Sequence, residues 1–251
     1  MTEERATIRL GVSGATGRLG RLVMDLADRD TRIEPSALPR GIAGVTTPRR
    51  PARTPPEVDV IVDVSSDAGC RAAIETAELK GVPIVIGTTG LSPETLASAH
   101  RLASRVAVMI APNLSRGALL LRRLVAMAAQ LAPSEWPFDL IETHRAEKRD
   151  APSGTAIAIA SESIDPNGAS RLEGRIASIR TGDVVGEHRV RIVGTGEELV
   201  LEHRAVDRTV FARGALEAAV WLTTRRPGMH PFESCLEPRT DGDQESGSSD
   251  A

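Results

Sequence analysis

The chain has 251 residues, of which 41% are hydrophobic and 26% charged, with a formal net charge of -3. A chain of this length can bury one large core or two modest cores, and we expect two domains. It carries no general basic field, and it holds three Phe, two Trp and no Tyr. These features argue against nucleic acid or anionic lipid as a partner, so local cations would have to hold an anionic ligand.

Neither the cysteines nor the N-terminus indicates export or a membrane. Cys70 and Cys235 stand far apart, without a CxxC or Cys/His ligand spacing. A disulfide framework or a zinc ribbon is therefore not expected. Acidic residues stand where a signal peptide would be basic, and no apolar run approaches the length of a membrane span. The sequence predicts a cytoplasmic protein without a membrane partner.

The first 113 residues alternate β and α patterns as an open, doubly wound sheet does. Residues 7–12 are expected to form a buried strand that runs through a Gly-rich turn into a helix. A second strand at 32–40 is a weaker prediction because of Pro35, and an irregular crossover rich in Pro and Arg follows at 41–57. The other expected elements are strands at 58–66, 82–90 and 105–113, with a helix between the first two and another at 92–104.

After Asn113 the pattern changes. A long helix, a strand and a helix capped by Ser153 are expected at 117–132, 138–144 and 153–163. Antiparallel strands separated by Gly turns are then expected at 175–183, 187–206 and 209–214, followed by a final helix at 214–225. The polar, acidic residues 238–251 are expected to be disordered.

Gly14, Gly17 and Gly20 form a G-x-x-G-x-x-G pattern at the first strand-to-helix turn. Missing side chains there let backbone N–H groups approach a pyrophosphate at the helix N-terminus. Such glycines also serve simple helix-strand packing, so the pattern alone is weak. Residues 87–89 and 111–114 strengthen it, because they follow apolar strands at the positions where open α/β sheets bind ligands.

The end of the second strand bears on the choice between NAD and NADP. A carboxylate there bonds the ribose hydroxyls of NAD, whereas an Arg accommodates the 2′-phosphate of NADP. Residues 37–40 offer no carboxylate but do offer Arg40. We expect NADPH to be preferred, with NADH possible. The alternative is that Arg40 is one solvated loop cation among several, the others being Arg49, Arg50 and Arg53.

The stretch ETHRAEKRDAPSGTA, residues 142–156, joins an anion-binding pattern to a proton donor. A Pro-Ser pair predicts a helix start from which the N–H groups of Gly154 and Thr155 point outward. Cations just upstream suit a carboxylate, and an imidazole among them can titrate near neutral pH. These upstream residues are Arg145, Lys148 and His144. The alternative is a charged loop followed by an N-capped helix.

The same stretch closely resembles the signature of the dihydrodipicolinate reductase family, Glu-x-His-His-x-x-Lys-x-Asp-x-Pro-Ser-Gly-Thr-Ala. Further blocks follow in the family's order, so the resemblance extends from residue 7 to about residue 225. They are GATGRLG, VDVSS, VIGTTG, APNLSRG, IRTGDVVGEH, GEELVLEHRAVDR and FARGALEAAVWL.

The resemblance implies an α/β fold with an N-terminal Rossmann-like, doubly wound parallel sheet. Residues 1–114 would form the dinucleotide-binding domain, and a C-terminal helix at 214–232 would return to it. Residues 115–213 would form an α+β domain on an open mixed sheet that binds substrate and assembles the oligomer, a homotetramer in the family.

The resemblance also implies roles for individual residues. His144 takes the position of the catalytic proton donor or acceptor, and Lys148 that of a second proton donor. The implied substrate contacts are Arg145, Ser153, Gly154 and Thr155. The implied cofactor contacts are Gly14, Ala15, Thr16, Gly17, Arg18, Leu19, Arg40, Gly87, Thr88, Thr89, Ala111, Pro112, Asn113 and Leu114.

Three departures from the family pattern bear on substrate fit and assembly. Arg145 stands where the family has a second His, and Arg is larger and permanently charged. The segment at 40–57 is short, and so is the connection between residues 163 and 175.

The implied activity is NAD(P)H-dependent reduction of 4-hydroxy-tetrahydrodipicolinate, a small dicarboxylate, to tetrahydrodipicolinate. One alternative is a reductase on the same scaffold with a different small carboxylate substrate. Another is a catalytically silent nucleotide-binding regulatory protein, although such a protein would not need His144 and Lys148 together. His188 and His203 lie beside Glu residues on predicted strands, but no short ligand spacing supports a metal. We predict no metal, and we expect His203 to face the cleft between the domains.

Overall fold

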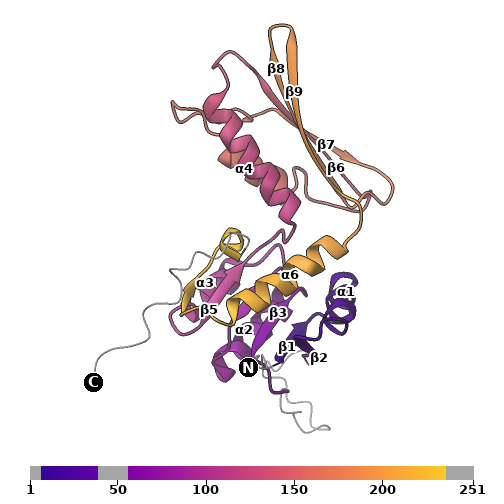
Figure 1. Cartoon of the computed structure of the whole chain (residues 1–251), viewed down its shortest axis with the longest axis vertical. Helices are drawn as coiled ribbons and strands as arrows, with labels where there is room; N and C mark the ends of the chain where they lie inside the picture. Colours follow the sequence, from indigo (N-terminus) through magenta and orange to yellow (C-terminus); the bar gives the residue numbers. More distant parts are fainter. Residues whose placement is uncertain (1–6, 39–55, 236–251) are drawn as a thin grey trace, which may run out of the picture.

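A computed structural model of the chain describes residues 7–38 and 56–235 (Figure 1). It contains a six-stranded sheet, called sheet A, and a four-stranded sheet, called sheet B. In Figure 1 sheet A and its helices lie in the lower half, sheet B with α4 (Arg116–Leu131) lies above, and α6 (Thr209–Leu222) runs from the junction across sheet A. Each sheet supports its own hydrophobic core.

Sheet A has the strand order β10-β5-β4-β3-β1-β2, and all its pairings are parallel. Its central strands are uniformly apolar because both faces are covered. In β3, for example, Val60 and Val62 enter the core under α1 and α6, whereas Ile61 enters the core under α2 and α3. The strands are β1 (Ile8–Ser13), β2 (Ile33–Ala37), β3 (Val60–Asp63), β4 (Ile84–Ile86), β5 (Ala107–Ile110) and β10 (Gly228–Met229), and the remaining helices are α1 (Arg18–Ala27), α2 (Asp67–Lys80) and α3 (Pro93–Leu102). The predicted doubly wound sheet is confirmed.

Serine N-caps begin four helices, as local sequence chemistry favours. In each, the serine hydroxyl accepts a hydrogen bond from the backbone N–H three residues ahead. The capping residues are Ser66, Ser92, Ser115 and Ser153. The last of these begins α5 (Gly154–Glu162), so the helix start expected from the Pro-Ser-Gly-Thr run is present.

Sheet B has the strand order β7-β6-β8-β9, and α4 and α5 share a core with it. Its strands are β6 (Phe138–His144), β7 (Ile176–Arg180), β8 (Gly186–Gly194) and β9 (Glu197–Ala205). The strands β8 and β9 are antiparallel as expected, but the prediction that 175–183 is antiparallel was wrong, because β7 pairs in parallel with β6. The helix α5 lies between these two strands in the chain and provides the crossover that a parallel pair requires. Sheet B is thus a mixed sheet, as the family resemblance implied.

The strand expected at 209–214 does not form, and the final helix, expected at 214–225 from its pattern and at 214–232 from the family resemblance, has other limits. Residues 209–222 form one helix, α6, because Ala212, Ala215 and Leu222 recur at helical spacing and pack into the core of sheet A. Gly214 is therefore a helix residue, and a Cβ there would collide with the carbonyl oxygen of Leu114.

Beyond α6 the chain does not continue as a helix. Pro227 and Pro231 flank a short extended segment that adds β10 to the edge of sheet A. A 3-10 turn, η1 (Phe232–Cys235), follows.

Arg40, almost all of the expected crossover at 41–57 and the tail at 238–251 lie outside the described residues. Within 7–38 and 56–235, no helix is both long and apolar enough to cross a membrane.

Candidate active site

Two adjoining cavities lie at the carboxyl ends of the strands of sheet A, where α/β sheets bind ligands. One, of about 460 Å³, lies between the two sheets and is lined from both sides. The other, of about 540 Å³, extends along the Gly-rich turn toward α2. Gly17, Val64 and Ser65 line both, so the two form one continuous cleft.

The Gly-rich turn has the form that a bound dinucleotide requires. Gly14 adopts a φ of +83°, and a Cβ there would lie 2.6 Å from the carbonyl oxygen of Val64. A Cβ at Gly20 would collide with the carbonyl oxygen of Gly14. Because Gly17 precedes α1 and has no side chain, the first backbone N–H groups of α1 can turn toward an anion in the cleft. The turn therefore fits the phosphates of a nicotinamide dinucleotide.

A buried carboxylate, Asp63, fixes the next two loops of the cleft. It ends β3 with 0% of its surface exposed, and it accepts hydrogen bonds from the hydroxyls of Ser65 and Thr88, each at 2.5 Å. The Thr88 oxygen in turn accepts from the Ser65 N–H at 2.8 Å. Asp63 thus joins the loops after β3 and β4, both of which line the cleft.

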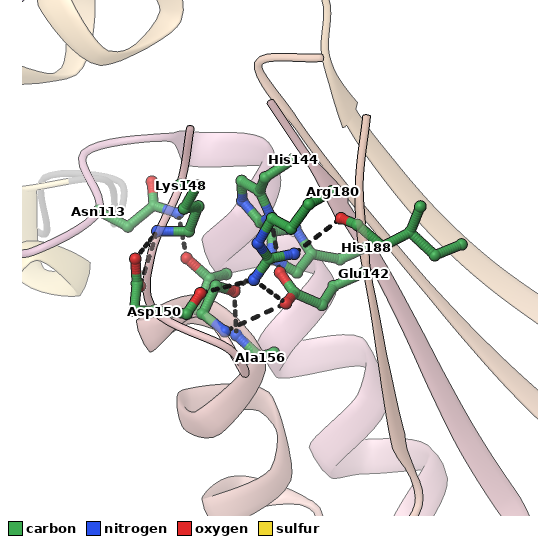
Figure 2. A network of polar contacts seen from close by, with 11 residues as sticks. Asn113, Glu142, His144, Lys148, Asp150, Ala156, Arg180 and His188 are labelled. Carbon is green, nitrogen blue, oxygen red and sulfur yellow. Dashed lines mark hydrogen bonds and ion pairs between the residues drawn. The ribbon is translucent and has the colours of Figure 1, made fainter. Parts of the chain in front are cut away.

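On the other side of the cleft, the alternation of β6 points Glu142 and His144 toward the same face of sheet B. Glu142 is fully buried, and its Oε2 lies 2.6 Å from Nδ1 of His144. Its Oε1 accepts from Nη2 of Arg180 at 2.7 Å and from the N–H of Ser153 at 3.3 Å. Figure 2 shows the side chains of Glu142, His144 and Arg180 pointing toward one another, with Ala156 in the first turn of α5 below them.

The buried charges are balanced within this group. Burial raises the pKa of Glu142, but hydrogen bonds from Ser178, Arg180 and Ser153 outweigh it and lower that pKa to about 2. Burial lowers the pKa of His144, and the carboxylate of Glu142 opposes this change. Glu142 is therefore ionised at neutral pH, while His144 is mostly in its neutral form.

Lys148 and Thr155 complete the wall that sheet B contributes. The Nζ of Lys148 lies 2.8 Å and 2.7 Å from the carboxylate oxygens of Asp150 (Figure 2). The hydroxyl of Thr155 accepts a hydrogen bond from the side-chain amide of Asn113 at 2.8 Å. Asn113 follows β5, so this bond links the two sides of the cleft directly.

Two sequence models of one protein family together match almost all of the chain. The model for the N-terminal part of dihydrodipicolinate reductase matches residues 8–114, and the model for its C-terminal part matches residues 117–236. The chain belongs to the dihydrodipicolinate reductase family.

Full-length relatives and a solved structure agree with the family assignment. The 4-hydroxy-tetrahydrodipicolinate reductase of Zymomonas mobilis is 33% identical, with 94% of this chain and 99% of the relative covered. The corresponding enzyme of Stenotrophomonas maltophilia is 36% identical, with 92% and 98% covered. The dipicolinate-bound dihydrodipicolinate reductase from Paenisporosarcina sp. TG-14 superimposes with a TM-score of 0.68 at 23% identity, with 90% of this chain and 97% of that chain covered, and thus shares the fold.

Most residues that the family resemblance singles out line the cleft. From the dinucleotide side these are Gly14, Thr16, Gly17, Arg18, Leu19, Gly87, Thr88, Thr89, Pro112, Asn113 and Leu114. From the other side they are His144, Arg145, Lys148 and Thr155. Ala15 and Ala111 pack into the core of sheet A and do not line either cavity. Ser153, which caps α5, is buried and Gly154 is exposed, and neither lines either cavity.

Three further residues line the cleft of this member of the dihydrodipicolinate reductase family, and the sequence pointed to only one of them, His203. His203 lines it as expected, but so does His188, whose ring meets that of His144 edge-on at 5.2 Å. Arg208 precedes α6 and also lines the cleft, and burial together with the charges of Arg145 and Arg18 lowers its pKa. The cleft therefore has an excess of positive charge that suits an anionic ligand.

Glu142, His144 and His188 also bring one potential metal-ligating atom each within 4.8 Å of one another. The contact between Glu142 and His144 at ion-pair distance accounts for this arrangement without a metal. Lys148 and Arg180 are close enough to lower the pKa of His144, and their positive charges oppose a bound cation.

The bonds of Thr88 predict a measurable effect on cofactor binding. Thr88→Val keeps the shape of the side chain but removes the bonds to Asp63 and Ser65. A hydrogen bond to a charged group contributes about 1.5–3 kcal/mol, so the dissociation constant for the dinucleotide should rise by about tenfold or more. Thr223→Val is the matched control, because that hydroxyl bonds within its own helix turn. Titration of NADPH fluorescence would measure both, and equal affinities would contradict the role of Thr88.

Proposed function

We propose that the chain reduces 4-hydroxy-tetrahydrodipicolinate to tetrahydrodipicolinate with NAD(P)H, a step of lysine and diaminopimelate biosynthesis. The observation that carries the proposal is the shared cleft, in which His144, Lys148 and Thr155 face the loops beside a dinucleotide turn. The relatives aligned over nearly their whole length bear the name of this reductase. Loss of a ring hydroxyl as water accompanies hydride addition, so the site must both bind a dicarboxylate and deliver a proton.

The proposed cofactor contacts are residues 14, 16–19, 87–89 and 112–114, all of which line the cleft. The N–H groups at the start of α1 would hold the pyrophosphate, while the loops after β4 and β5 would hold the nicotinamide end near His144. The bound nicotinamide supplies the hydride. In this arrangement residues 1–114 with α6 form the dinucleotide-binding domain, and residues 115–208 form the substrate domain. The boundary follows the start of α6 at Thr209.

The substrate carboxylates are held, in this proposal, by the start of α5 and by cations. Thr155 and the outward N–H groups of the first turn would bind one carboxylate. Arg145, which lines the cleft, would bind the other. A permanently charged Arg in place of His suits a carboxylate that carries its own full charge.

His144 and Lys148 would transfer the protons. Lys148, held by Asp150, is the proposed proton donor. His144 has its Nδ1 occupied by Glu142 and so acts through Nε2, either accepting or donating. A catalytically silent nucleotide-binding protein would need neither a proton donor nor a general base, so that alternative is the weaker one.

The first test is turnover and its loss in variants. With substrate generated in the cuvette by the preceding synthase, the protein should consume NADPH. His144→Gln and Lys148→Ala should each lower kcat by roughly one hundredfold or more, the usual scale for removing an acid-base group, with little change in cofactor affinity. His100→Gln and Lys80→Ala, both away from the cleft, are the matched controls.

Three outcomes of this assay are informative. Near-normal kcat in both site variants would remove these residues from the mechanism. If the wild type binds NADPH but turns over a different small carboxylate, the alternative substrate is favoured. Arg145, which stands where the family has a second His, is the reason to consider that alternative. Binding without turnover of any carboxylate would favour the regulatory alternative.

We further propose that NADPH is preferred over NADH through Arg40. A charge-assisted Arg-phosphate contact contributes about 1.5–3 kcal/mol, so kcat/KM should favour NADPH by about tenfold to a hundredfold. Arg40→Ala should remove most of this preference, chiefly by raising KM for NADPH. Arg29→Ala, exposed at the far end of α1, is the control. Equal use of both cofactors by wild type would defeat the proposal, and a loss in Arg49→Ala instead would move the contact there.

A cytoplasmic homotetramer is the proposed state of the protein. Apolar side chains on α4 support assembly, because four of them are 40–77% exposed at a helical spacing and lie on one side of the helix. They are Leu120, Leu124, Met127 and Leu131. Light scattering should give about four times the chain mass of 26.7 kDa. Met127→Lys should lower that mass, whereas Arg123→Lys should not, and a monomeric wild type would exclude this assembly.

A further inference from the structure

We propose that Glu142 is a positioning residue for the reduction, one that orients His144 and fixes it relative to the start of α5 and the Lys148 loop. The inference rests on the proposed function, because it assigns a device to the proposed acid-base residue. It concerns a side chain that never faces the cleft, since Glu142 is fully buried and does not line the cavity.

The first support is the way in which the His144 ring is held. Nδ1 lies 2.6 Å from the Glu142 carboxylate, which leaves Nε2 as the nitrogen available to a ligand. A Cβ on Gly186, a residue that lines the cleft, would lie 3.1 Å from this Nε2. The glycine therefore leaves the space into which Nε2 points, and Glu142 determines which nitrogen points there.

The second support is that one carboxylate connects three parts of the site. Beside His144, Glu142 accepts from the N–H of Ser153, the residue that caps α5. It also accepts from Arg180, whose same nitrogen donates to the carbonyl oxygen of Asp150 at 2.6 Å. Asp150 holds the Nζ of Lys148. Loss of Glu142 would therefore loosen the proposed acid, base and carboxylate-binding groups together.

The third support is the balance of charge around His144. The groups that face it are Lys148 from the following loop, Arg180 from β7, His188 from β8 and Glu142 from its own strand. Burial and the two cations favour the neutral imidazole, whereas Glu142 favours the protonated form. Burial lowers the pKa of His188 to about 3, so it stays neutral and adds no charge. Among the described residues around His144, the Glu142 carboxylate is thus the counter-charge for the imidazolium.

The sign of the effect follows from this balance. Replacing Glu142 with an uncharged group removes an influence that raises the pKa of His144, so that pKa should fall. Replacing Arg180 with an uncharged group removes an influence that lowers it, so the pKa should rise. Both changes should lower kcat, since each disturbs the orientation of the ring. A residue needed only for folding would not give opposite shifts.

The test combines NMR titration of the imidazole with kinetics. The His144 resonance is assigned by its absence in His144→Gln, and it is titrated in the full-length protein without substrate. Glu142→Gln should move the His144 titration to lower pH and reduce kcat by about tenfold or more, while NADPH affinity stays near the wild-type value. Glu187→Gln is the matched control, because it carries the same substitution on β8, opposite Thr143. The Glu187 carboxylate pairs with Arg204 and not with His144.

Arg180→Met keeps the test decisive if Glu142→Gln does not fold. It keeps the Glu142 carboxylate but removes the Arg180 bond that holds it, so it should raise the His144 pKa while lowering kcat. The proposal would be overturned if folded Glu142→Gln protein showed an unchanged His144 titration and wild-type kcat. If Glu142→Gln does not fold, the same result for Arg180→Met would overturn it. Because the titration needs no substrate, failure of the proposed reduction would appear separately, as an inactive wild type.

Discussion

The arrangement of the cleft depends on one buried interaction, the ionised carboxylate of Glu142 between Arg180 and His144. A carboxylate with no exposed surface is costly unless its charge is compensated by hydrogen bonds and an opposite charge. Arg180 and the backbone of Ser153 supply that compensation, and in doing so they bring β7 and the start of α5 against β6. The parallel pairing of β7 with β6 places Arg180 beside Glu142, so the site depends on the strand whose direction was wrongly predicted as antiparallel.

Sheet A reflects a simpler constraint that is visible in the sequence. Its central strands are buried on both faces, so they appear as continuous apolar runs, and serines mark the starts of α2 and α3. These signals are local, which is why the order of the elements from β1 to β5 could be predicted. The limits were less accurate, because β3, β4 and β5 are each shorter than the strands expected at 58–66, 82–90 and 105–113. Pro35 made β2 a weak prediction, yet β2 forms at the outer edge of the sheet, where a missing N–H leaves no neighbouring strand unbonded.

The errors arose where distant contacts override local preference. A strand is favoured locally by the β-branched or aromatic side chains of Thr209, Val210 and Phe211. These residues instead form the first turn of α6, because the alanine-rich face that follows them is buried in the core of sheet A. Gly214 resembles a turn residue in sequence, whereas its real constraint is contact with the backbone at Leu114, a hundred residues earlier. Likewise Arg180 and His188 reach Glu142 through strand register, and register between separate strands cannot be derived from spacing within one motif.

The family signature can now be given a physical explanation that its letters do not contain. Within residues 142–156, alternate positions of β6 place Glu142 behind His144, the following turn returns Lys148 and Asp150 toward the same cleft, and Ser153 ends the turn by capping α5. The two outermost parts of this stretch are joined by the Glu142–Ser153 bond, so the loop between them is closed at its base. A loop closed in this way can hold a lysine and an imidazole at fixed positions with little burial of its own. Several polar residues lie together in this stretch because they pair with one another, as Lys148 does with Asp150 and Glu142 with His144, while Arg145, Lys148 and His144 also line the cleft.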